Sequence, residues 1–450
     1  MAQDLLSLWF GLTRRVDRAT YLRHGLALTL LKYVVDAALV FAATGTRWTP
    51  LDYANPLFLG RQHAMGNAPT WLLAALVVWA LPFLWIGLSM SLRRCLDARV
   101  SPWFALLFFT PLLNWAFLLV MSALPSRPQP PQSPDGPPRQ QDAWVRSALA
   151  ASVVGAISGL AITAMITFGL KNYGMALFVG MPIGTCAVAG WLFNRPLVRS
   201  PRATATLGAF TVLLLAGSLL IFAAEGAICI GMVLPLALPL GAAGAIVGRH
   251  LAVRAIPMRP AALLLLLLPF SAWAETRVHT ALPLREVLTA VDVAAPPERV
   301  WPHVLQFGEL PAPSPFIEHS GIAYPQRAHL DGQGVGAIRY CEFSTGPFIE
   351  PITAWEPPAR LAFDVRAQPP PMKEWSPYAD LHPPHFDGTL ESKRGEFRLI
   401  ALPNGHTRLE GRTWYTLDMG PSAYWTVFTD LAIHRIHERV LDHVKTLSEQ

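Results

Sequence analysis

Long apolar runs occupy the first two thirds of the chain, and short alternating segments occupy the last third. Seven of these runs can cross a bilayer as helices, because about 20 apolar residues span its hydrocarbon core. The pattern predicts a membrane part of seven or eight spans, followed by one domain outside the bilayer. The seven runs are Tyr21–Ala43, Trp71–Leu92, Trp103–Leu124, Trp144–Leu170, Met175–Phe193, Thr204–Ala224 and Ala227–Val247.

A proline-rich segment divides the membrane part into two modules. Residues 125–143 contain several adjacent prolines, and such a segment behaves as an extended spacer. We therefore expect a first module at residues 1–124 and a second module of four helices at residues 144–250. The second module is rich in Gly and Ala, which suit close packing of helices in lipid.

A leucine-rich segment at residues 251–276 follows the second module. Arg259 precedes six consecutive leucines, and the segment ends with Ala272-Trp273-Ala274. A basic lead, a short apolar core and small residues at the end are typical of a secretory signal. We expect an eighth span here that exports the C-terminal domain, and its Ala-Trp-Ala end has the form of a cleavage site.

Two arginine motifs characterise the first module. Arg15-Val-Asp-Arg18 precedes the first span, and Arg93-Arg94-Cys-Leu96-Asp-Ala-Arg99 follows the second. Together they resemble the YhaH-type family of bacterial inner-membrane proteins (domain of unknown function number 805), which usually has His at the position of Leu96. The resemblance covers about residues 8–125 and brings no known activity. We expect these arginines to set topology and to contact lipid headgroups.

Charge and cysteine content agree with a membrane protein. Only 15% of the 450 residues are charged, against about a quarter in an average soluble protein. The net charge of +6 comes largely from arginines beside apolar runs, which indicates a membrane surface and no nucleic-acid partner. Lys32 and Asp36 should form an ion pair within the first span. The four cysteines have no metal-knuckle or disulfide spacing.

The basic loops leave the orientation in the membrane open. Arg14–Arg23, Arg93–Arg99, Arg195–Arg202 and Arg249–Arg259 should all face the cytoplasm. Eight simple spans would place the first two loops opposite the last two, so one run is miscounted or one module departs from the rule. The signal-like segment favours a periplasmic position for the C-terminal domain.

Residues 277–450 alternate in the manner of a β-rich domain. A helix should begin at Pro296 and run to Phe307, and a long helix should occupy Ser422–Leu447. The loop Gln368–Gly388 holds polar residues that include Glu374. Seven strands are predicted, at Val287–Val293, Ala323–Leu330, Val335–Phe343, Phe348–Trp355, Arg360–Ala367, Glu396–Leu402 and His406–Leu417.

The order of one strand, helices, six strands and one helix accompanies a motif at the first helix. An apolar strand leads into Ala295-Pro296-Pro297, followed by Val300-Trp301. This resembles the START-like superfamily (SRPBCC, polyketide-cyclase-like) over about residues 285–448. The resemblance implies an α+β helix-grip fold, in which a curved antiparallel sheet wraps around the terminal helix and leaves a cavity. Such cavities bind lipids, sterols, polyketides or other apolar molecules, and many members are not enzymes.

The last predicted helix carries titratable residues on or beside its apolar stripe. Asp430 and His437 lie on or next to the stripe, and His434 lies at its edge. Amphipathic helices of soluble domains normally keep such groups off the apolar face. These three are the candidate catalytic residues, and either partners in a core satisfy them or the face lines a cavity.

Three interpretations of these side chains stay open. In the first, Asp430 orients a cavity histidine that moves a proton on a bound carbonyl compound. In the second, His434 and His437 bind a metal with His382 or His385 and a carboxylate. In the third, which we favour, hydrogen bonds fix the helix against the proline-rich loop. We therefore predict no metal site and no cofactor.

The candidate ligand contacts lie on the sheet and on the last helix. Arg339 and Glu342 occupy opposite faces of one predicted strand, so one of them must point inward. Trp414, Tyr424 and His437 complete the set, although aromatic residues on a sheet belong to the core more often than to a ligand site.

We expect a membrane-anchored domain that binds an apolar or lipid-like small molecule in the bacterial inner membrane. Its partners would be membrane lipids and this ligand. Two alternatives are a cyclase- or dehydratase-type enzyme on an apolar substrate, and an envelope interaction or scaffold protein. The sequence leaves open whether the domain is an enzyme.

Overall fold

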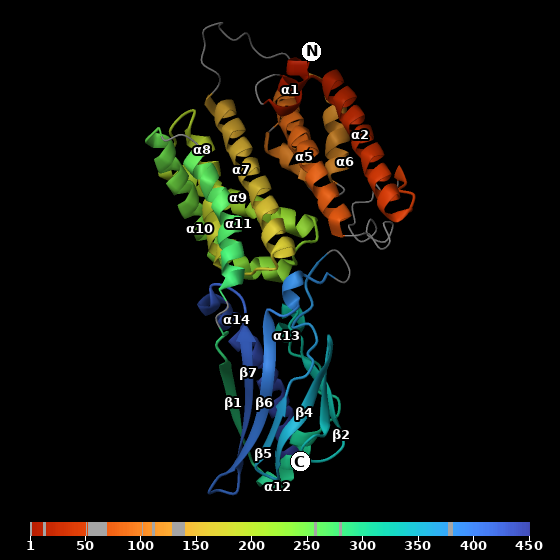
Figure 1. The fold of residues 1–450 in the computed structure, drawn as a ribbon, viewed down its shortest axis with the longest axis vertical. Helices are drawn as coiled ribbons and strands as arrows, with labels where there is room; N and C mark the ends of the chain where they lie inside the picture. Colours follow the sequence, from red (N-terminus) through yellow and green to blue (C-terminus); the bar gives the residue numbers. More distant parts are fainter. Residues whose placement is uncertain are drawn as a thin grey trace.

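The structure is a computed structural model with a helical part and, at one end of it, a domain of seven strands (Figure 1). The first helical module contains α1 (Ala2–Phe10), α2 (Arg18–Thr44), α5 (Thr70–Ala98), the 3₁₀ helix η1 (Pro102–Phe109) and α6 (Leu113–Ala123). The residues that the structure describes are 2–11, 15–50, 52, 70–100, 102–109, 113–127, 140–255, 259–278, 281–376 and 381–450.

The second module packs five long helices together. Two short π-helical segments, η2 and η3, lie between α7 and α8. The bounds are α7 Gln140–Ala164, η2 Met165–Gly169, η3 Ala176–Gly180, α8 Met181–Asn194, α9 Pro201–Ile221, α10 Ala227–Val253 and α11 Arg259–Arg277.

The predicted membrane part is confirmed as a set of long apolar helices. Among the described residues, five helical stretches are long and apolar enough to cross a bilayer. The predicted pair of Lys32 and Asp36 also forms, with the ammonium donating to the carboxylate inside α2. The five stretches are Arg18–Thr44, Arg146–Gly169, Ala176–Asn194, Pro201–Ile221 and Ala227–Val253.

The third apolar run differs from the continuous span expected at Trp103–Leu124. It is divided into η1 and α6, with residues 110–112 outside the described part. The Arg94 Nε donates to the Met121 carbonyl at 2.9 Å, and the Arg127 N–H donates to the Asp97 carbonyl at 3.2 Å. The chain therefore leaves the end of α5 and returns to that same end.

Two arginines of the first module are buried within the protein, so the expectation of headgroup contact is wrong for them. Arg93 and Arg94 are 2% and 0% exposed. Arg93 donates to the Leu8 carbonyl and to Ser89, and Arg94 pairs with Asp97 at 2.7 Å. Because a buried guanidinium needs several acceptors, these residues hold α1, α5 and α6 together.

Glycines allow α8 and α10 to approach closely, as the composition of the second module predicts. A Cβ on Gly190 would lie 2.1 Å from the Ala245 carbonyl oxygen. One on Gly244 would lie 2.3 Å from the Ile183 carbonyl oxygen. Side chains at these positions would push the two backbones apart.

The leucine-rich segment is helix α11, and it packs against η3 and α8. Leu268 lies over Gly180 and Gly184, where an added Cβ would contact it. Ala272 is completely buried, and its carbonyl accepts a hydrogen bond of 2.8 Å from the Asn172 amide. The Ala-Trp-Ala sequence is therefore part of a packed helix, and its cleavage stays a prediction.

The C-terminal domain has the predicted curved antiparallel sheet and terminal helix. The strand order is β1-β7-β6-β5-β4-β3-β2, with every neighbouring pair antiparallel. The sixth strand begins at Leu390, six residues before the predicted start. The bounds are β1 Arg285–Val293, α12 Pro297–Leu305, α13 Pro315–Ser320, β2 Pro325–Asp331, β3 Ile338–Phe343, β4 Gly346–Glu356, β5 Arg360–Asp364, η4 Pro384–Phe386, β6 Leu390–Ala401, β7 Thr407–Leu417 and α14 Ser422–Glu449.

The described residues of the basic loops lie at the end of the helical part that faces away from the strand domain (Figure 1). In the first module, a hydrogen bond of 2.8 Å between Tyr21 and Ser91 places the start of α2 beside the end of α5. In the second, Arg249 donates to the Arg199 carbonyl at 2.8 Å. Since the run after α5 turns back, both sets of arginines share one end.

Candidate functional site

The strand domain docks on the second module through the first turn of α10. This turn presents backbone N–H groups that have no partner within the helix. The buried Glu374 carboxylate accepts from the N–H of Ile228 at 3.1 Å and from that of Cys229 at 3.0 Å. The Trp375 carbonyl accepts from Ala227 at 2.8 Å. A loop of one domain therefore caps a membrane helix of the other.

The start of α14 makes the second group of docking contacts. The Tyr424 hydroxyl donates to the Met232 carbonyl at 2.5 Å, and the Gly420 N–H donates to the Tyr173 carbonyl at 2.9 Å. The rings of Trp425 and Phe178 have centroids 4.8 Å apart. One apolar cluster consequently runs from the membrane helices into the strand domain. Tyr424 was predicted as a ligand contact, and the structure places it at this contact between domains.

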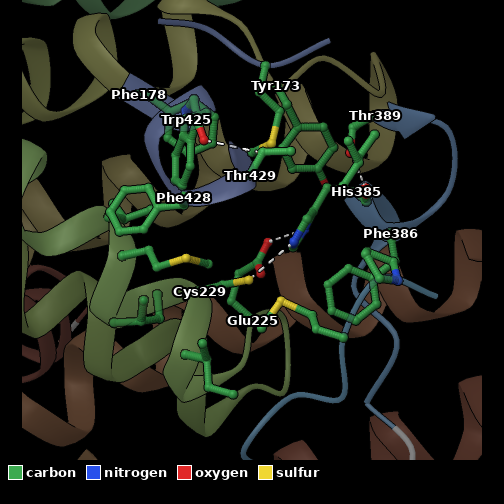
Figure 2. A pocket seen from close by; sticks show the side chains of 18 of the residues that line it. Tyr173, Phe178, Glu225, Cys229, His385, Phe386, Thr389, Trp425, Phe428 and Thr429 are labelled. Atoms are coloured by element: carbon green, nitrogen blue, oxygen red, sulfur yellow. Dashed lines mark hydrogen bonds and ion pairs between the residues drawn. The ribbon is translucent and has the colours of Figure 1, made fainter. Parts of the chain in front are cut away.

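A cavity of about 460 Å³ lies at the junction of the two domains. Membrane helices α8, α9 and α10 line one part of it, and α14 with the loops of the strand domain lines the other. Its walls are mainly apolar, and Figure 2 shows Phe178, Trp425 and Phe428 among them. The hollow expected beneath the last helix is thus present, and it extends into the membrane module.

A smaller hollow of about 110 Å³ continues beneath α14. It shares five wall residues with the large cavity, namely Phe343, Phe348, Ser392, Ile433 and Ile436. His437 lines it, and both ring nitrogens have hydroxyl partners, since Nδ1 is 3.1 Å from Thr289 Oγ1 and Nε2 is 2.8 Å from Thr413 Oγ1. Burial, with a smaller contribution from His434, lowers the pKa of His437 to about 4.

The other two candidate catalytic residues have different partners. His434 Nδ1 is 2.8 Å from Thr289 Oγ1, so it shares this hydroxyl with His437. The Asp430 carboxylate accepts from the Tyr415 hydroxyl at 2.5 Å and pairs with Arg285 at 3.0 Å. The hydrogen bonds that the structure gives to these groups join α14 to β1 and β7.

Arg339 is the inward-pointing member of the Arg339–Glu342 pair. Its side chain is 2% exposed, forms an ion pair with buried Glu350 and lines the smaller hollow. Its guanidinium also lies over the rings of Phe307, Phe363 and Phe397, with centroid distances between 5.5 and 5.7 Å.

Glu342 and Trp414 lie on the other face of the sheet. Glu342 pairs with Arg327 at 2.6 Å on the neighbouring strand β2. Trp414 packs under the guanidinium of Arg394 at 4.2 Å from its ring centroid. Neither residue lines the two cavities beneath α14. Their proposed role in ligand contact stays a prediction that this geometry does not favour.

A polar cluster in the wall of the large cavity contains His385, which the sequence suggested as a metal ligand, together with two residues that were not predicted. Glu225 comes from the α9–α10 turn, Cys229 from the first turn of α10 and His385 from η4 of the strand domain (Figure 2). Cys229 Sγ is 3.2 Å from His385 Nε2, and Glu225 Oε1 is 3.6 Å from His385 Nδ1. The spacing of Glu225 and Cys229 was the available signal, but their partner lies 156 residues further along.

The two histidines of the proline-rich loop have separate environments. His385 joins the cluster just described, while His382 Nε2 lies 2.9 Å from Asp387 Oδ1 near the surface. Neither is a hydrogen-bond partner of His434 or His437 among the contacts that the described residues make. Among the described residues, Glu225, Cys229 and His385 instead form a group whose ligand atoms could surround one metal ion, since these atoms all lie within 4.8 Å of one another.

Comparison with solved structures finds similar chains at low sequence identity. The Zhui aromatase/cyclase of Streptomyces sp. R1128 is 14% identical with a TM-score of 0.24, over 37% of this chain and 94% of that one. Norcoclaurine synthase from Thalictrum flavum is 11% identical with a TM-score of 0.23, over 37% and 96%. A protein of Thermus thermophilus is 13% identical with a TM-score of 0.24, over 36% and 97%. A comparison with curated proteins gives no match.

Two family matches cover the two ends of the chain. Residues 9–132 match the family described as "Protein of unknown function (DUF805)". Residues 285–449 match the family described as "Polyketide cyclase / dehydrase and lipid transport". Both predicted resemblances are therefore confirmed, and the chain is a fusion of a DUF805 membrane module with a C-terminal polyketide cyclase-like (SRPBCC) domain.

Proposed function

We propose that this protein takes up an apolar, lipid-like molecule beside the bilayer and holds it under α14. The cavity of about 460 Å³ is the observation that carries the proposal, because membrane helices and the SRPBCC domain build its walls together. Its volume falls within the range of about 300–1,000 Å³ that is usual for small-molecule sites. Apolar side chains line a route from α8, α9 and α10 to the space below α14.

The polar part of the ligand should decide which molecule is retained. Moving an acyl chain from lipid into this cavity exchanges one apolar environment for another, so the hydrophobic effect provides little selection. The polar lining residues include Thr185, Thr211, Thr429 and His385. A single-chain amphiphile with a small head therefore fits the cavity better than a fully apolar molecule.

We also propose that the SRPBCC domain lies on the periplasmic side of the bacterial inner membrane. The basic loops share the opposite end of the helical part, and such loops are retained in the cytoplasm. With the run after α5 turning back, α2, α5 and α7–α11 would make seven crossings. An odd number of crossings puts the start of α2 and the SRPBCC domain on opposite sides of the membrane. With the basic loops in the cytoplasm, the domain is then periplasmic.

Binding can be tested with the full chain in detergent and a fluorescent fatty-acid analogue as the probe. Ala432 on α14 lines the cavity, so Ala432→Trp should fill it and weaken probe binding at least about tenfold. Ala423 lies on the exposed side of the same helix, and Ala423→Trp is the matched control. Equal affinity of the two variants, or no binding by the unmodified chain, would refute the proposed function.

The orientation can be tested separately in intact cells. The four native cysteines are buried, so cysteines introduced at exposed positions report on access. Glu391→Cys on β6 should react with a membrane-impermeant maleimide in intact cells, and Arg202→Cys at the basic end should react only after permeabilisation. The reverse pattern would place the domain in the cytoplasm.

A further inference from the structure

The cluster of Glu225, Cys229 and His385 combines the side chains that bind transition metals. Thiolate, imidazole and carboxylate are the usual ligands of Zn²⁺ in proteins. Two ligand atoms of a tetrahedral zinc site lie about 3.3–3.5 Å apart, given bond lengths of about 2.0–2.3 Å. Cys229 Sγ lies 3.2 Å from His385 Nε2, close to these values, and one ligand atom from each of Glu225, Cys229 and His385 lies within 4.8 Å of the other two.

Polar atoms of the same cluster lack partners among the described residues. Glu225 Oε2 and His385 Nδ1 are buried without a hydrogen bond. The side chains of Glu225 and His385 are only 16% and 11% exposed. A buried polar atom without a partner is costly, so a further group should satisfy these atoms.

The charge of the site indicates that this group is a cation. The ion pairs of the described residues provide Glu225 with no Lys or Arg, and its only ionic neighbour is His385. The Glu374 carboxylate adds a second negative group beside Cys229, where it accepts from that residue's backbone N–H. Two carboxylates in a buried site favour a divalent cation between them.

We propose that Glu225, Cys229 and His385 bind one Zn²⁺ ion. Three protein ligands leave one position of a tetrahedral site open, and all three residues line the large cavity. The open position therefore faces the cavity, where water or the head of a bound molecule can occupy it. Because Glu225 and Cys229 belong to the membrane module and His385 to the SRPBCC domain, the ion also links the two domains.

The metal content of the purified full chain tests the site, with zinc alone as the probe. After growth with added zinc, elemental analysis should give one zinc per chain in the unmodified protein. Glu225→Gln, Cys229→Ser and His385→Ala should each weaken zinc binding by more than about 100-fold, since a direct ligand is lost. The matched controls are Cys186→Ser, in the same cavity wall, and His382→Ala, in the same loop, and both should retain the ion.

A cobalt spectrum of the unmodified chain provides a readout that needs no variant. Co²⁺ bound in the zinc site should give the near-ultraviolet charge-transfer band of a cobalt–thiolate bond, because Cys229 is a ligand. Absence of this band, absence of zinc in the unmodified chain, or retention of zinc by His385→Ala overturns the proposal. A zinc-free chain that still binds the fatty-acid probe would overturn the metal site and leave the proposed function standing.

Discussion

The cap that Glu374 places on α10 should hold the SRPBCC domain against the membrane module. Glu374 is 8% exposed, and its carboxylate accepts from two backbone N–H groups in the first turn of α10. It also lies at the positive end of the helix dipole. We expect Glu374→Ala to loosen the first turn of α10 and the docking of the domain.

The size of the effect follows from the groups left behind. Loss of an N-terminal cap costs about 0.5–2 kcal/mol. A buried N–H left without a partner costs about 1–3 kcal/mol, and Glu374→Ala leaves those of Ile228 and Cys229. Because these contributions overlap and water can enter the space, we expect a total of about 2–4 kcal/mol. This corresponds to opening of the contact about 30- to 1,000-fold more often.

Hydrogen exchange of the full chain in lipid nanodiscs measures this opening directly. Peptides that contain Ile228 and Cys229 should exchange about 30- to 1,000-fold faster in Glu374→Ala. Glu374→Gln should have a smaller effect, since its amide oxygen can still accept. Glu391→Ala, at an exposed ion pair on β6, is the control and should leave these peptides unchanged. Unchanged exchange in Glu374→Ala would show that the cap does not hold the domains together.

Three further predictions concern stability of the full chain in detergent. Folding lowers the pKa of His437 from 6.5 to about 4, so the unfolded chain takes up a proton first as the pH drops. The free energy of unfolding should therefore decrease by about 3 kcal/mol between pH 6.5 and pH 4. Thermal unfolding of His437→Gln across this pH range should lack this decrease. Arg339→Met should cost about 3–5 kcal/mol in denaturant unfolding, because Glu350 is left buried without its partner; a cost under 1 kcal/mol would contradict this. Gly244→Ala should lower the melting temperature, because the added methyl group would overlap the Ile183 carbonyl and cost about 1–3 kcal/mol. Gly231→Ala is the control, since no atom lies within 4 Å of its Cβ. Equal melting temperatures of the two variants would exclude the tight α8–α10 contact.

The division into a membrane part and a β-rich domain that ends in a long helix could be predicted from local patterns. Apolar runs of sufficient length have few alternatives to membrane helices, and strict alternation with turn residues indicates strands. The ion pair of Lys32 and Asp36 was also predictable, because residues four apart share a helix face. The same local logic led to the expectation of a continuous third span. The return of the chain to Asp97 depends on contacts of Arg94 and Arg127 that no local pattern contains.

The candidate site shows the same division between local and tertiary information. The stripe of α14 predicted which side chains of that helix face inward, His437 among them, since helical periodicity depends only on neighbouring residues. The hollow itself was expected only from the resemblance to START-like domains. Whether Arg339 or Glu342 faces inward was decided by the register of β3 against β4, which pairs Arg339 with Glu350. Docking of one domain on the other brings Glu374 to the first turn of α10. The same docking brings His385 beside Glu225 and Cys229. Sequence alone determined most of the elements and the buried face of the last helix. Only the tertiary structure decided which distant side chains share a cavity, because packing between domains is set by contacts that have no period along the chain.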